Sequence, residues 1–358
     1  MARALELAAL GLNTTDPNPR VGAVVARGEE VIGEGWHQRA GEPHAEVFAL
    51  RAAGERARGA TLYVTLEPCS HQGRTPPCAD AVVAAGVARV VMAMADPNPR
   101  VNGGGNAKLR AAGIALESGL LEEEARELNP GFVQRMSRGR PWVRLKLGTS
   151  LDGRIALPSG ESQWITGEES RADVQRWRAR SSAILTSHAT VLRDDPRLDV
   201  RLEGASRQPL RVILDGNLET PAVARILDKP GDVLIFTSAH GSLSREALES
   251  RGARVASIGR SATGGVDLRG VLEQLAREEM NEVWIECGAR LAGAFVSEGL
   301  VDELIVYQAP ALLGSEAVGM FHLPAPVALA QAPRWRFTDV RRIGEDLRIV
   351  ARPREQNQ

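Results

Sequence analysis

The sequence predicts an α/β protein with two domains, and three observations lead to that class. Apolar, strand-like runs alternate with helical patterns along the chain, which is typical of layered folds built around a mostly parallel sheet. The 358 residues exceed what one ordinary hydrophobic core holds together. Hydrophobic residues make up 43% and charged residues 25%, the profile of a soluble globular protein.

The first domain is predicted to span residues 1–140. Its helices are predicted at 44–57, from a helical composition, and at 78–86, where Gly86 ends the pattern. A connecting helix and an exit loop are predicted within 120–141. Short β-branched or buried apolar runs predict the strands, which lie at 21–27, 60–68, 87–96 and 114–118.

The second domain is predicted to span residues 141–358. It opens with a strand in WVRLKLGTSLDGRIA (142–156), just after the boundary expected near 139–141. Helical patterns separate most of its strands, so this domain is also predicted to be α/β. Its further strands are predicted at 182–187, 210–215, 232–238, 282–288 and 303–310.

Composition and charge narrow the classes of function. The net charge is −1, so there is no basic excess to bind a nucleic-acid backbone, although a local basic pocket for one phosphate stays open. The N-terminus has no basic flank leading into a long apolar run, and no stretch approaches the roughly 20 apolar residues of a membrane span. Three cysteines, an odd number, favour a reducing cytoplasm and ligand or bystander thiols over disulfides.

The strongest chemical signal combines HAE at 44–46 with PCSHQGRTPPC at 68–78. Zinc takes nitrogen and thiolate ligands, so His44, Cys69 and Cys78 are the predicted metal ligands. Three protein ligands leave a fourth position for water, whose pKa the metal lowers toward about 7. Glu46, two residues after the histidine, is the predicted general acid/base that moves protons. Together these residues predict hydrolytic deamination.

The spacing of the two cysteines departs from the common deaminase pattern. Eight residues separate Cys69 from Cys78, whereas zinc deaminases commonly carry P-C-x-x-C. Spacing alone makes this a poor zinc motif, but a Pro-rich excursion can return the second cysteine to the same metal. His71 and Arg74 in that excursion are expected to form part of the pocket wall. Cys287, in a strand without ligand-type neighbours, is expected to be a packed core thiol.

Features of the second half leave alternatives open when each is taken alone. No G-x-G-x-x-G follows a strand, and GARLAG (288–293) is either a phosphate-binding turn or a simple strand–helix connection. Trp164 either packs in the core or stacks on a flat cofactor ring. LRDDPRLDVR (192–201) is either a solvated charged loop or an arginine clamp for phosphate with a carboxylate near the reacting group.

Longer stretches resemble the bifunctional riboflavin-biosynthesis deaminase–reductases. Four resemble the deaminase half: PNPRVGAVV (17–25), GWHQRAGEPHAEVFAL (35–50), TLEPCSHQGRTPPCADA (65–81) and DPNPRV (96–101). Four resemble the reductase half: KLGTSLDGRIA (146–156), SGESQWITG (159–167), AILTSHATVLRDDPRLDVR (183–201) and ECGARLAGAF (286–295). The resemblance covers nearly the whole chain in the expected order, and the long insertion between the cysteines sets this family apart from plain cytidine deaminases.

The resemblance implies a cytidine-deaminase-like three-layer α/β/α domain followed by a dihydrofolate-reductase-like α/β domain. It implies zinc in the first domain and NADPH in the second, with Asp194 at the reduction centre and near the cofactor. The residues implied to bind substrate are Ser162, Arg178, Leu198, Arg201 and Glu286. Those implied to bind NADPH are Gly148, Trp164, Thr190, Asp194, Gly288, Ala289, Arg290, Leu291, Ala292, Gly293 and Ala294.

The resemblance also implies two consecutive reactions on a small phosphoribosyl pyrimidine. The first is hydrolytic deamination of 2,5-diamino-6-(5-phosphoribosylamino)pyrimidin-4-one, and the second is reduction of the ribosyl group to ribityl with NADPH. A homodimer through the reductase domain is expected by the same analogy. No nucleic-acid or membrane partner is expected.

Three other classes of function explain less of the sequence. A deaminase of free nucleosides or of tRNA leaves the second domain without a role, and the near-neutral charge argues against tRNA. A structural zinc module usually has four protein ligands, and no obvious fourth is present, although His37 and His71 lie nearby in sequence. A binding protein without activity has no need of all four residues of the deaminase set.

Overall fold

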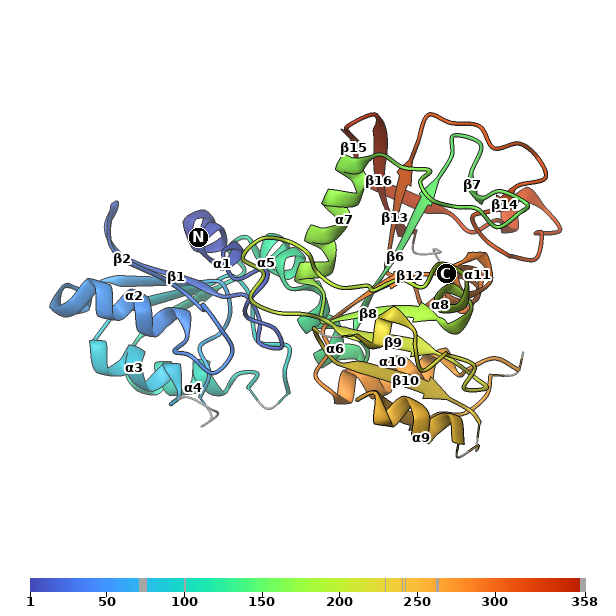
Figure 1. The fold of residues 1–358 in the computed structure, drawn as a ribbon. Coiled ribbons are helices and arrows are strands. Elements are labelled where there is room, and N and C mark those ends of the chain that lie inside the picture. Colours follow the sequence, from blue (N-terminus) through green and yellow to red (C-terminus); the bar gives the residue numbers. More distant parts are fainter. Residues whose placement is uncertain are drawn as a thin grey trace. The chain divides into compact units, whose positions relative to one another are not determined.

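The computed structural model describes residues 1–70, 76–99, 101–228, 230–239, 241, 243–261 and 264–354 (Figure 1). The chain divides into two compact units, Met1–Arg140 and Pro141–Gln358. Each unit combines a sheet with helices, which confirms the predicted α/β class. Among the described residues, no helix is both long enough and apolar enough to cross a membrane.

The first unit contains short helices around one sheet. The helices are α1 (Ala2–Ala9), α2 (Ala45–Ala53), the 3-10 helix η1 (Gly54–Ala57), α3 (Cys78–Ala85), α4 (Gly104–Ala111), α5 (Glu122–Leu128) and α6 (Pro130–Arg138). The strands are β1 (Gly22–Arg27), β2 (Glu30–Trp36), β3 (Thr61–Val64), β4 (Arg89–Met92) and β5 (Ala115–Ser118). Gly86 ends α3 in the left-handed conformation with φ 68°, as the helical pattern predicts.

The sheet of the first unit has the strand order β2-β1-β3-β4-β5. Strands β3, β4 and β5 run parallel, whereas β1 is antiparallel to both β2 and β3. The sheet is therefore mixed, and the expectation of a mostly parallel sheet is wrong for its β1–β2 side. The sequence does not predict β2, because the glycines and charges of EVIGEGW obscure the strand pattern.

Helices cover both faces of this sheet, which gives the three layers that the resemblance implies (Figure 1). α1 packs against Val24, and α2 covers the opposite face. Two glycines of β2 allow α2 to approach very closely. A Cβ on Gly33 would lie 2.3 Å from the carbonyl oxygen of Ala49, and one on Gly35 would lie 2.5 Å from that of Ala45. This close packing fixes the beginning of α2 against the sheet.

The second unit is larger. Its helices are α7 (Glu168–Arg180), α8 (His188–Asp194), η2 (Arg225–Leu227), α9 (Leu243–Ser250), α10 (Leu268–Arg277), α11 (Ala289–Ser297) and η3 (Leu329–Gln331). Its strands are β6 (Trp142–Thr149), β7 (Arg154–Ala156), β8 (Ala183–Ser187), β9 (Leu210–Leu214), β10 (Val233–Thr237), β11 (Arg254–Ser257), β12 (Glu282–Glu286), β13 (Glu303–Gln308), β14 (Val318–Gly319), β15 (Trp335–Ile343) and β16 (Asp346–Pro353).

The main sheet of this unit has the order β11-β10-β9-β8-β12-β6-β13-β16-β15. It is parallel from β11 to β13, and β16 and β15 join antiparallel at one edge. One face packs on α10 and α11, and the other face packs on α7 and α9. Strands lie at all six predicted positions. Five of them carry a continuous apolar run that is buried on both faces, whereas β6 places Arg144 and Lys146 between its apolar residues.

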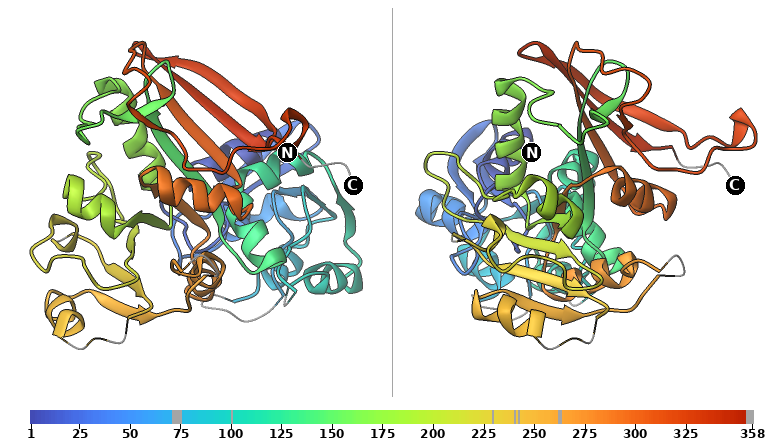
Figure 2. Two further views of the ribbon diagram at one scale, coloured as in Figure 1. Left: turned by 90° about the vertical axis from the view of Figure 1, so that its right-hand side faces the viewer. Right: turned by 45° about the vertical axis from the view of Figure 1, so that its right-hand side comes forward.

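The sequence does not predict β11, β15 or β16. β15 is the edge strand and is exposed along most of its length, and the β15–β16 hairpin (red) is visible at that edge in both views of Figure 2. Its sequence, WRFTDVRRI, mixes charged residues with the exposed Phe337 and Val340. A strand without a buried face does not alternate between apolar and polar residues, so its sequence gives no strand signal.

A buried arginine ties three strands of this sheet together. Arg144 of β6 donates hydrogen bonds to Glu303 of β13, at 2.6 Å, and to Glu282 of β12. Its side chain is 3% exposed, and its guanidinium lies 5.4 Å from the ring centroid of Trp177. Arg180 also reaches Glu282, at 3.2 Å. The carboxylates and the guanidinium thus neutralise each other away from water.

We predict that Arg144→Met strongly destabilises the second unit, because it leaves two buried carboxylates short of a countercharge. Removing one partner of a buried charge network costs roughly 3–5 kcal/mol. Urea unfolding followed by tryptophan fluorescence measures this, since five of the six tryptophans lie after residue 140. Arg341→Met, which breaks the exposed pair with Asp339, is the control and should change little. Equal effects of both variants would contradict the prediction.

Candidate functional site

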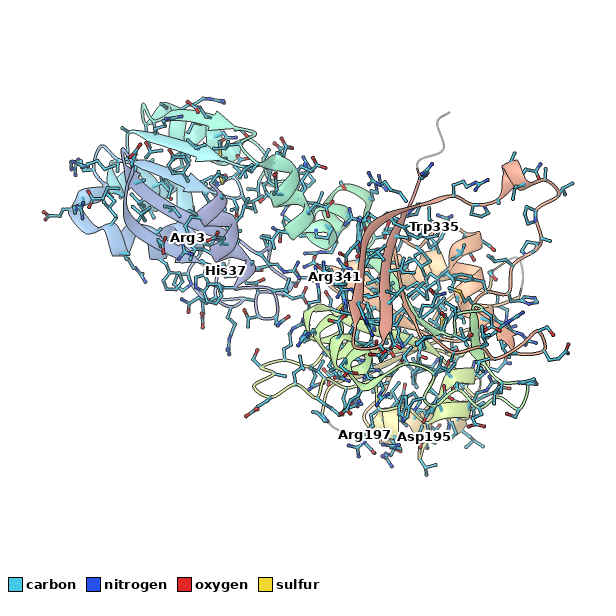
Figure 3. The ribbon with its side chains drawn as sticks, turned by 90° about the horizontal axis from the view of Figure 1, so that it is seen from above. Arg3, His37, Asp195, Arg197, Trp335 and Arg341 are labelled. Carbon is cyan, nitrogen blue, oxygen red and sulfur yellow. The ribbon has the colours of Figure 1, made fainter. Side chains whose placement is uncertain are left out.

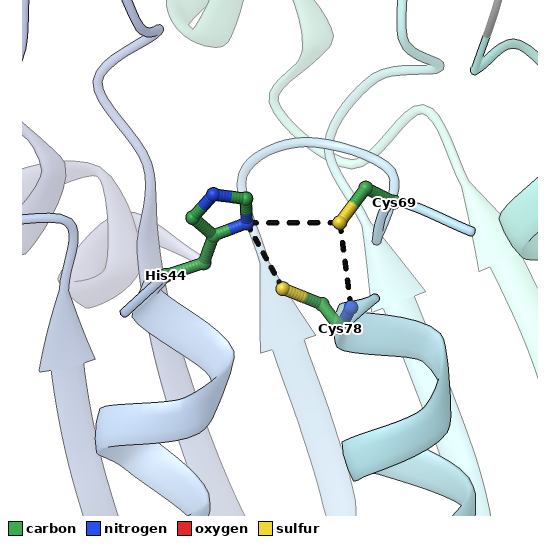
Figure 4. A group of neighbouring side chains, drawn as sticks. All are labelled: His44, Cys69 and Cys78. Atoms are coloured by element: carbon green, nitrogen blue, oxygen red, sulfur yellow. Dashed lines mark hydrogen bonds between the residues drawn. The ribbon is translucent and has the colours of Figure 1, made fainter. Parts of the chain in front are cut away.

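Three metal-ligand side chains meet in the first unit (Figure 4). His44 is the N-cap of α2, Cys69 follows β3, and Cys78 is the first residue of α3. His44 Nδ1 lies 3.0 Å from Cys78 Sγ and 3.7 Å from Cys69 Sγ. Two helix starts and one strand end therefore bring together residues that the sequence separates by as many as 34 positions.

Backbone hydrogen bonds hold the two cysteines together. The Cys78 N–H donates to Cys69 Sγ at 3.3 Å, and the Ala79 N–H donates to the Cys69 carbonyl oxygen at 3.0 Å. The first turn of α3 therefore binds both the side chain and the backbone of Cys69. Pro77 at the N-cap favours the start of the helix at this point, because its φ angle is already fixed.

The donor set fits a zinc ion. Zinc bonds measure about 2.0–2.1 Å to nitrogen and about 2.3 Å to sulfur, so a tetrahedral site separates nitrogen from sulfur by roughly 3.6 Å. The observed separations of 3.0 and 3.7 Å are close to that value. One imidazole nitrogen and two sulfurs form a ligand set typical of zinc, and three ligands are the number typical of catalytic sites.

Glu46 lies in the first turn of α2, beside these ligands. Its side chain is buried at 3% exposure, and its Oε2 has no hydrogen-bond partner among the described residues. Burial raises the pKa of this carboxyl group above its usual value. A buried carboxyl group with an unused oxygen next to three metal donors is suited to exchange protons with a molecule bound at the metal.

The thiols and the imidazole are electrostatically coupled. A hydrogen bond with Cys78 is the main reason that the pKa of Cys69 falls to about 4, while the same contact and burial raise the pKa of Cys78. The hydrogen bond with Cys69 raises the pKa of His44. Negative charge is thus concentrated on the Cys69 sulfur, in the thiolate form that binds a metal cation, whereas Cys78 has to release its proton when a metal binds.

His37 does not complete a fourth protein ligand. Its ring centroid is 5.2 Å from that of His44, but both of its nitrogens are engaged. Nδ1 contacts the Pro43 carbonyl oxygen at 3.1 Å, and Nε2 contacts Asn18 Nδ2 at 3.1 Å. Burial lowers the pKa of His37, so the ring is held neutral. His71 lies outside the described residues, as does Arg74, the other residue predicted for the pocket wall.

In the second unit, a charged group joins several predicted substrate residues. Arg178 binds Glu286 with both Nε and Nη2, at 2.6 and 2.9 Å. Burial opposes ionisation of Glu286, but Arg178 overcomes it and lowers the pKa of this carboxyl to about 2. Lys146, which the sequence analysis missed as a site residue, faces this pair from β6, and burial lowers its pKa. A lysine within the buried strand run WVRLKLG was the available signal.

The 192–201 segment is partly buried, so a fully solvated loop is the wrong interpretation. Leu198 and Asp199 are buried, and Asp199 binds Arg201 Nη1 through its carboxylate at 2.5 Å. The Asp199 carbonyl accepts a hydrogen bond from Arg178 at 3.1 Å, which connects the segment to the charged group. Asp194 ends α8, and burial raises its pKa. Figure 3 shows Asp195 and Arg197 together at one edge of this unit.

The 159–167 loop, which carries Ser162, lies next to the end of α8. A Cβ on Gly160 would be 3.8 Å from Arg193 Nε. Trp164 is 69% exposed, so the core interpretation of this residue is wrong, and the Arg171 guanidinium lies 4.7 Å from its ring centroid. Gly148 faces Thr166 at 3.4 Å from its Cβ position and Lys146 Nζ at 3.6 Å.

Two helix starts supply the other predicted cofactor residues. Thr190 lies in the first turn of α8, where its N–H donates to Ser187 Oγ at 3.3 Å. Gly288 is the N-cap of α11, no side chain caps this end among the described residues, and no atom lies within 4 Å of its Cβ position. Of the turn that follows, Ala292 lies in the core, and a Cβ on Gly293 would be 2.1 Å from the His322 carbonyl oxygen. An open helix start without a capping side chain is suited to bind a cofactor phosphate through the backbone N–H groups of its first turn, at Ala289, Arg290 and Leu291. Ala294 lies further along the same helix.

Comparisons with known proteins match both units. The family model of the cytidine and deoxycytidylate deaminase zinc-binding region matches residues 1–94, and that of the RibD C-terminal domain matches residues 141–349. The riboflavin biosynthesis protein RibD of Escherichia coli K12 is 52% identical over 97% of this chain and 96% of its own length. That of Aquifex aeolicus is 42% identical over 98% of this chain and 96% of its own length.

Solved structures agree with this match. Acinetobacter baumannii RibD superposes with a TM-score of 0.92 at 47% identity, covering 99% of this chain and 98% of the other. A Thermotoga maritima protein described as a diaminohydroxyphosphoribosylaminopyrimidine deaminase/5-amino-6-(5-phosphoribosylamino)uracil reductase gives a TM-score of 0.88 at 33% identity, covering 99% and 97%. The likeness therefore spans both units.

We predict that Cys78→Ser lowers the zinc content of the purified protein well below one per chain, because a neutral hydroxyl replaces a thiolate ligand. Cys287→Ser is the matched control, since Cys287 packs against the core of the second unit, where burial raises the pKa of its thiol. Atomic emission of the dialysed proteins measures the metal. Full zinc retention in Cys78→Ser would refute the assignment of this ligand.

Proposed function

This chain belongs to the family of bifunctional riboflavin-biosynthesis deaminase–reductases, and we propose that its first unit performs the deamination and its second unit the reduction. It is an enzyme with hydrolase and oxidoreductase activities, and its cofactors are zinc and NADPH. The observation that carries the assignment of the first activity is the meeting of His44, Cys69 and Cys78 beside the buried carboxyl group of Glu46.

The substrates are proposed from the description of the Thermotoga maritima relative. The first is 2,5-diamino-6-(5-phosphoribosylamino)pyrimidin-4-one, which loses an amino group as ammonia. The product, 5-amino-6-(5-phosphoribosylamino)uracil, is then reduced at the ribosyl group to ribityl. Both are small-molecule pyrimidines, in accord with a chain whose net charge is −1.

In the proposed deamination, His44, Cys69 and Cys78 would hold zinc, which would supply Lewis-acid activation of a water molecule. The water oxygen forms a bond to the ring carbon, and the carbon–nitrogen bond to the amino group breaks. Glu46 accepts the proton of the water and returns it to the departing nitrogen. The raised pKa of Glu46 suits both directions of transfer, because it brings the proton affinity of the carboxyl group closer to that of the groups with which it exchanges the proton.

In the proposed reduction, NADPH supplies a hydride for C1 of the opened ribosyl group, and the residues of this unit orient the two carbons. The uncapped start of α11 binds a phosphate of the cofactor. The Arg178–Glu286 pair and Lys146 form a charged group that is suited to bind polar atoms of the substrate. Asp194, whose pKa burial raises, lies at the end of α8 as a proton source or electrostatic partner.

We also propose a homodimer formed through the second unit. β15 is an open edge strand with exposed Phe337 and Val340, and Figure 3 shows Trp335 and Arg341 along it. An exposed edge with apolar side chains favours pairing with a second copy. A cytoplasmic location stays a prediction that rests on the use of the cysteines as ligand or core thiols.

We predict that Glu46→Gln abolishes ammonia release and leaves zinc near one per chain, since an amide cannot shuttle the proton but does not remove a ligand. The experiment incubates the zinc-loaded protein with the aminopyrimidine substrate and NADPH, and measures ammonia and NADPH oxidation. Wild-type protein should release ammonia first and oxidise NADPH second. Loss of zinc in Glu46→Gln would show that Glu46 is a ligand, and the proposed role would be wrong.

We predict that Asp194→Asn slows NADPH oxidation by about a hundredfold or more, because removing a positioned proton donor or charge costs roughly 10²–10⁴-fold in typical cases. Ammonia release should continue at the wild-type rate. Supplying the deaminated intermediate directly isolates the second step. Equal loss of both activities would contradict separate sites in the two units.

A further inference from the structure

A second buried carboxylate lies close to the metal ligands and has no part in the mechanism above. Glu67 is placed just after β3, two residues before Cys69, and is 3% exposed. Its oxygens accept three backbone N–H donors, from Asp96 at 3.4 Å, Gly103 at 3.2 Å and Asn106 at 3.2 Å. These three N–H groups satisfy the hydrogen-bonding needs of this buried carboxylate.

Two of these donors are the N-cap residue and the third residue of α4. This helix has Gly103 at its N-cap, which offers no capping side chain. Glu67 therefore replaces a local cap from 36 positions away in the sequence. The first turn of α4 is bound to the strand end that carries Cys69, and a carboxylate at this end of the helix is also favoured by the helix dipole.

The glycines of α4 make this contact very close. A Cβ on Gly105 would lie 1.9 Å from the Pro68 carbonyl oxygen, and a Cβ on Gly104 would lie 2.5 Å from Ser70 Oγ. The first turn of α4 thus lies directly against the residues on both sides of Cys69. This approach explains Gly105, because no side chain fits against the Pro68 carbonyl, and Gly103 has a left-handed φ of 78° that favours glycine.

We propose that Glu67 is a positioning residue for the metal centre, which holds the Cys69 segment against α4 so that its sulfur faces His44 and Cys78. The α3 side already binds Cys69 through Cys78 and Ala79. Glu67 and α4 supply the opposing contact, so the sulfur is fixed from two directions. This inference rests on the proposed zinc-dependent deamination.

The test compares Glu67→Gln with wild type. The amide keeps the size of the side chain but turns an NH₂ group toward N–H donors, so at least one hydrogen bond to α4 is lost. Zinc release to a metallochromic chelator should become about tenfold faster, the lower end of the effect of outer-shell substitutions. Glu117→Gln, which alters an exposed pair with Arg89 in the same unit, is the control and should release zinc at the wild-type rate.

The dependence of ammonia release on the zinc concentration distinguishes a positioning role from a general loss of folding. At nanomolar free zinc, Glu67→Gln should release little ammonia, and micromolar zinc should restore most of it, because the ligands themselves are intact. NADPH oxidation with the deaminated intermediate should equal wild type. A loss of ammonia release that excess zinc does not restore, or an unchanged rate of zinc release, would overturn the proposal.

Gly104→Ala provides a second variant should Glu67→Gln fail to fold. Its Cβ meets the end of the Ser70 side chain rather than backbone, so a small shift accommodates it. It should speed zinc release in the same direction by a smaller factor, and a wild-type rate in this variant would count against the proposal. A wild-type protein that neither holds zinc nor releases ammonia would instead refute the proposed function itself.

Discussion

Helices on both faces of the main sheet in each unit constrain where this chain can place charged and polar side chains. Strands such as β9 and β10 are buried along their whole length, so charged groups cannot be accommodated on the faces without partners. Residues of the candidate sites therefore gather where strands end. In the first unit, Cys69 and Glu67 follow β3, and in the second, Glu286 ends β12 and Gly288 follows it. The same constraint produces two unrelated sites in one chain.

The elements that the sequence predicts best are those that the covering helices bury. Continuous apolar runs predict the parallel strands β8, β9, β10, β12 and β13 of the second unit, and Gly86 predicts the end of α3. Strands with an exposed face or with glycines do not stand out. β2 carries Gly33 and Gly35 because α2 needs room, and its pattern reflects that contact rather than its own conformation. β15 is exposed at the sheet edge, so its polar sequence is indistinguishable from a loop.

The residues of the candidate sites also fall into two groups, those that the sequence predicts and those that it does not. Metal-ligand chemistry is visible in sequence, because histidine and cysteine near a glutamate are rare enough to be informative. Residues whose role depends on their position in the fold are not visible in the sequence. Lys146 alternates with leucines in an ordinary strand, and Trp164 is exposed although its type suggests a core residue. Glu67 owes its importance to three backbone N–H groups that come from residues 96–106, and no local pattern reports such partners.

The eight residues between the cysteines illustrate why spacing is a weak guide once tertiary contacts exist. A short C-x-x-C turn brings two sulfurs together through its own geometry. Here the N–H groups of Cys78 and Ala79 bind the sulfur and the carbonyl oxygen of Cys69, so two hydrogen bonds fix the ends of the insertion directly. The length between fixed ends then costs only a slowly growing loop entropy. The two sulfurs therefore meet although eight residues separate them in the sequence, which is why spacing alone misjudges this pair of ligand-type residues.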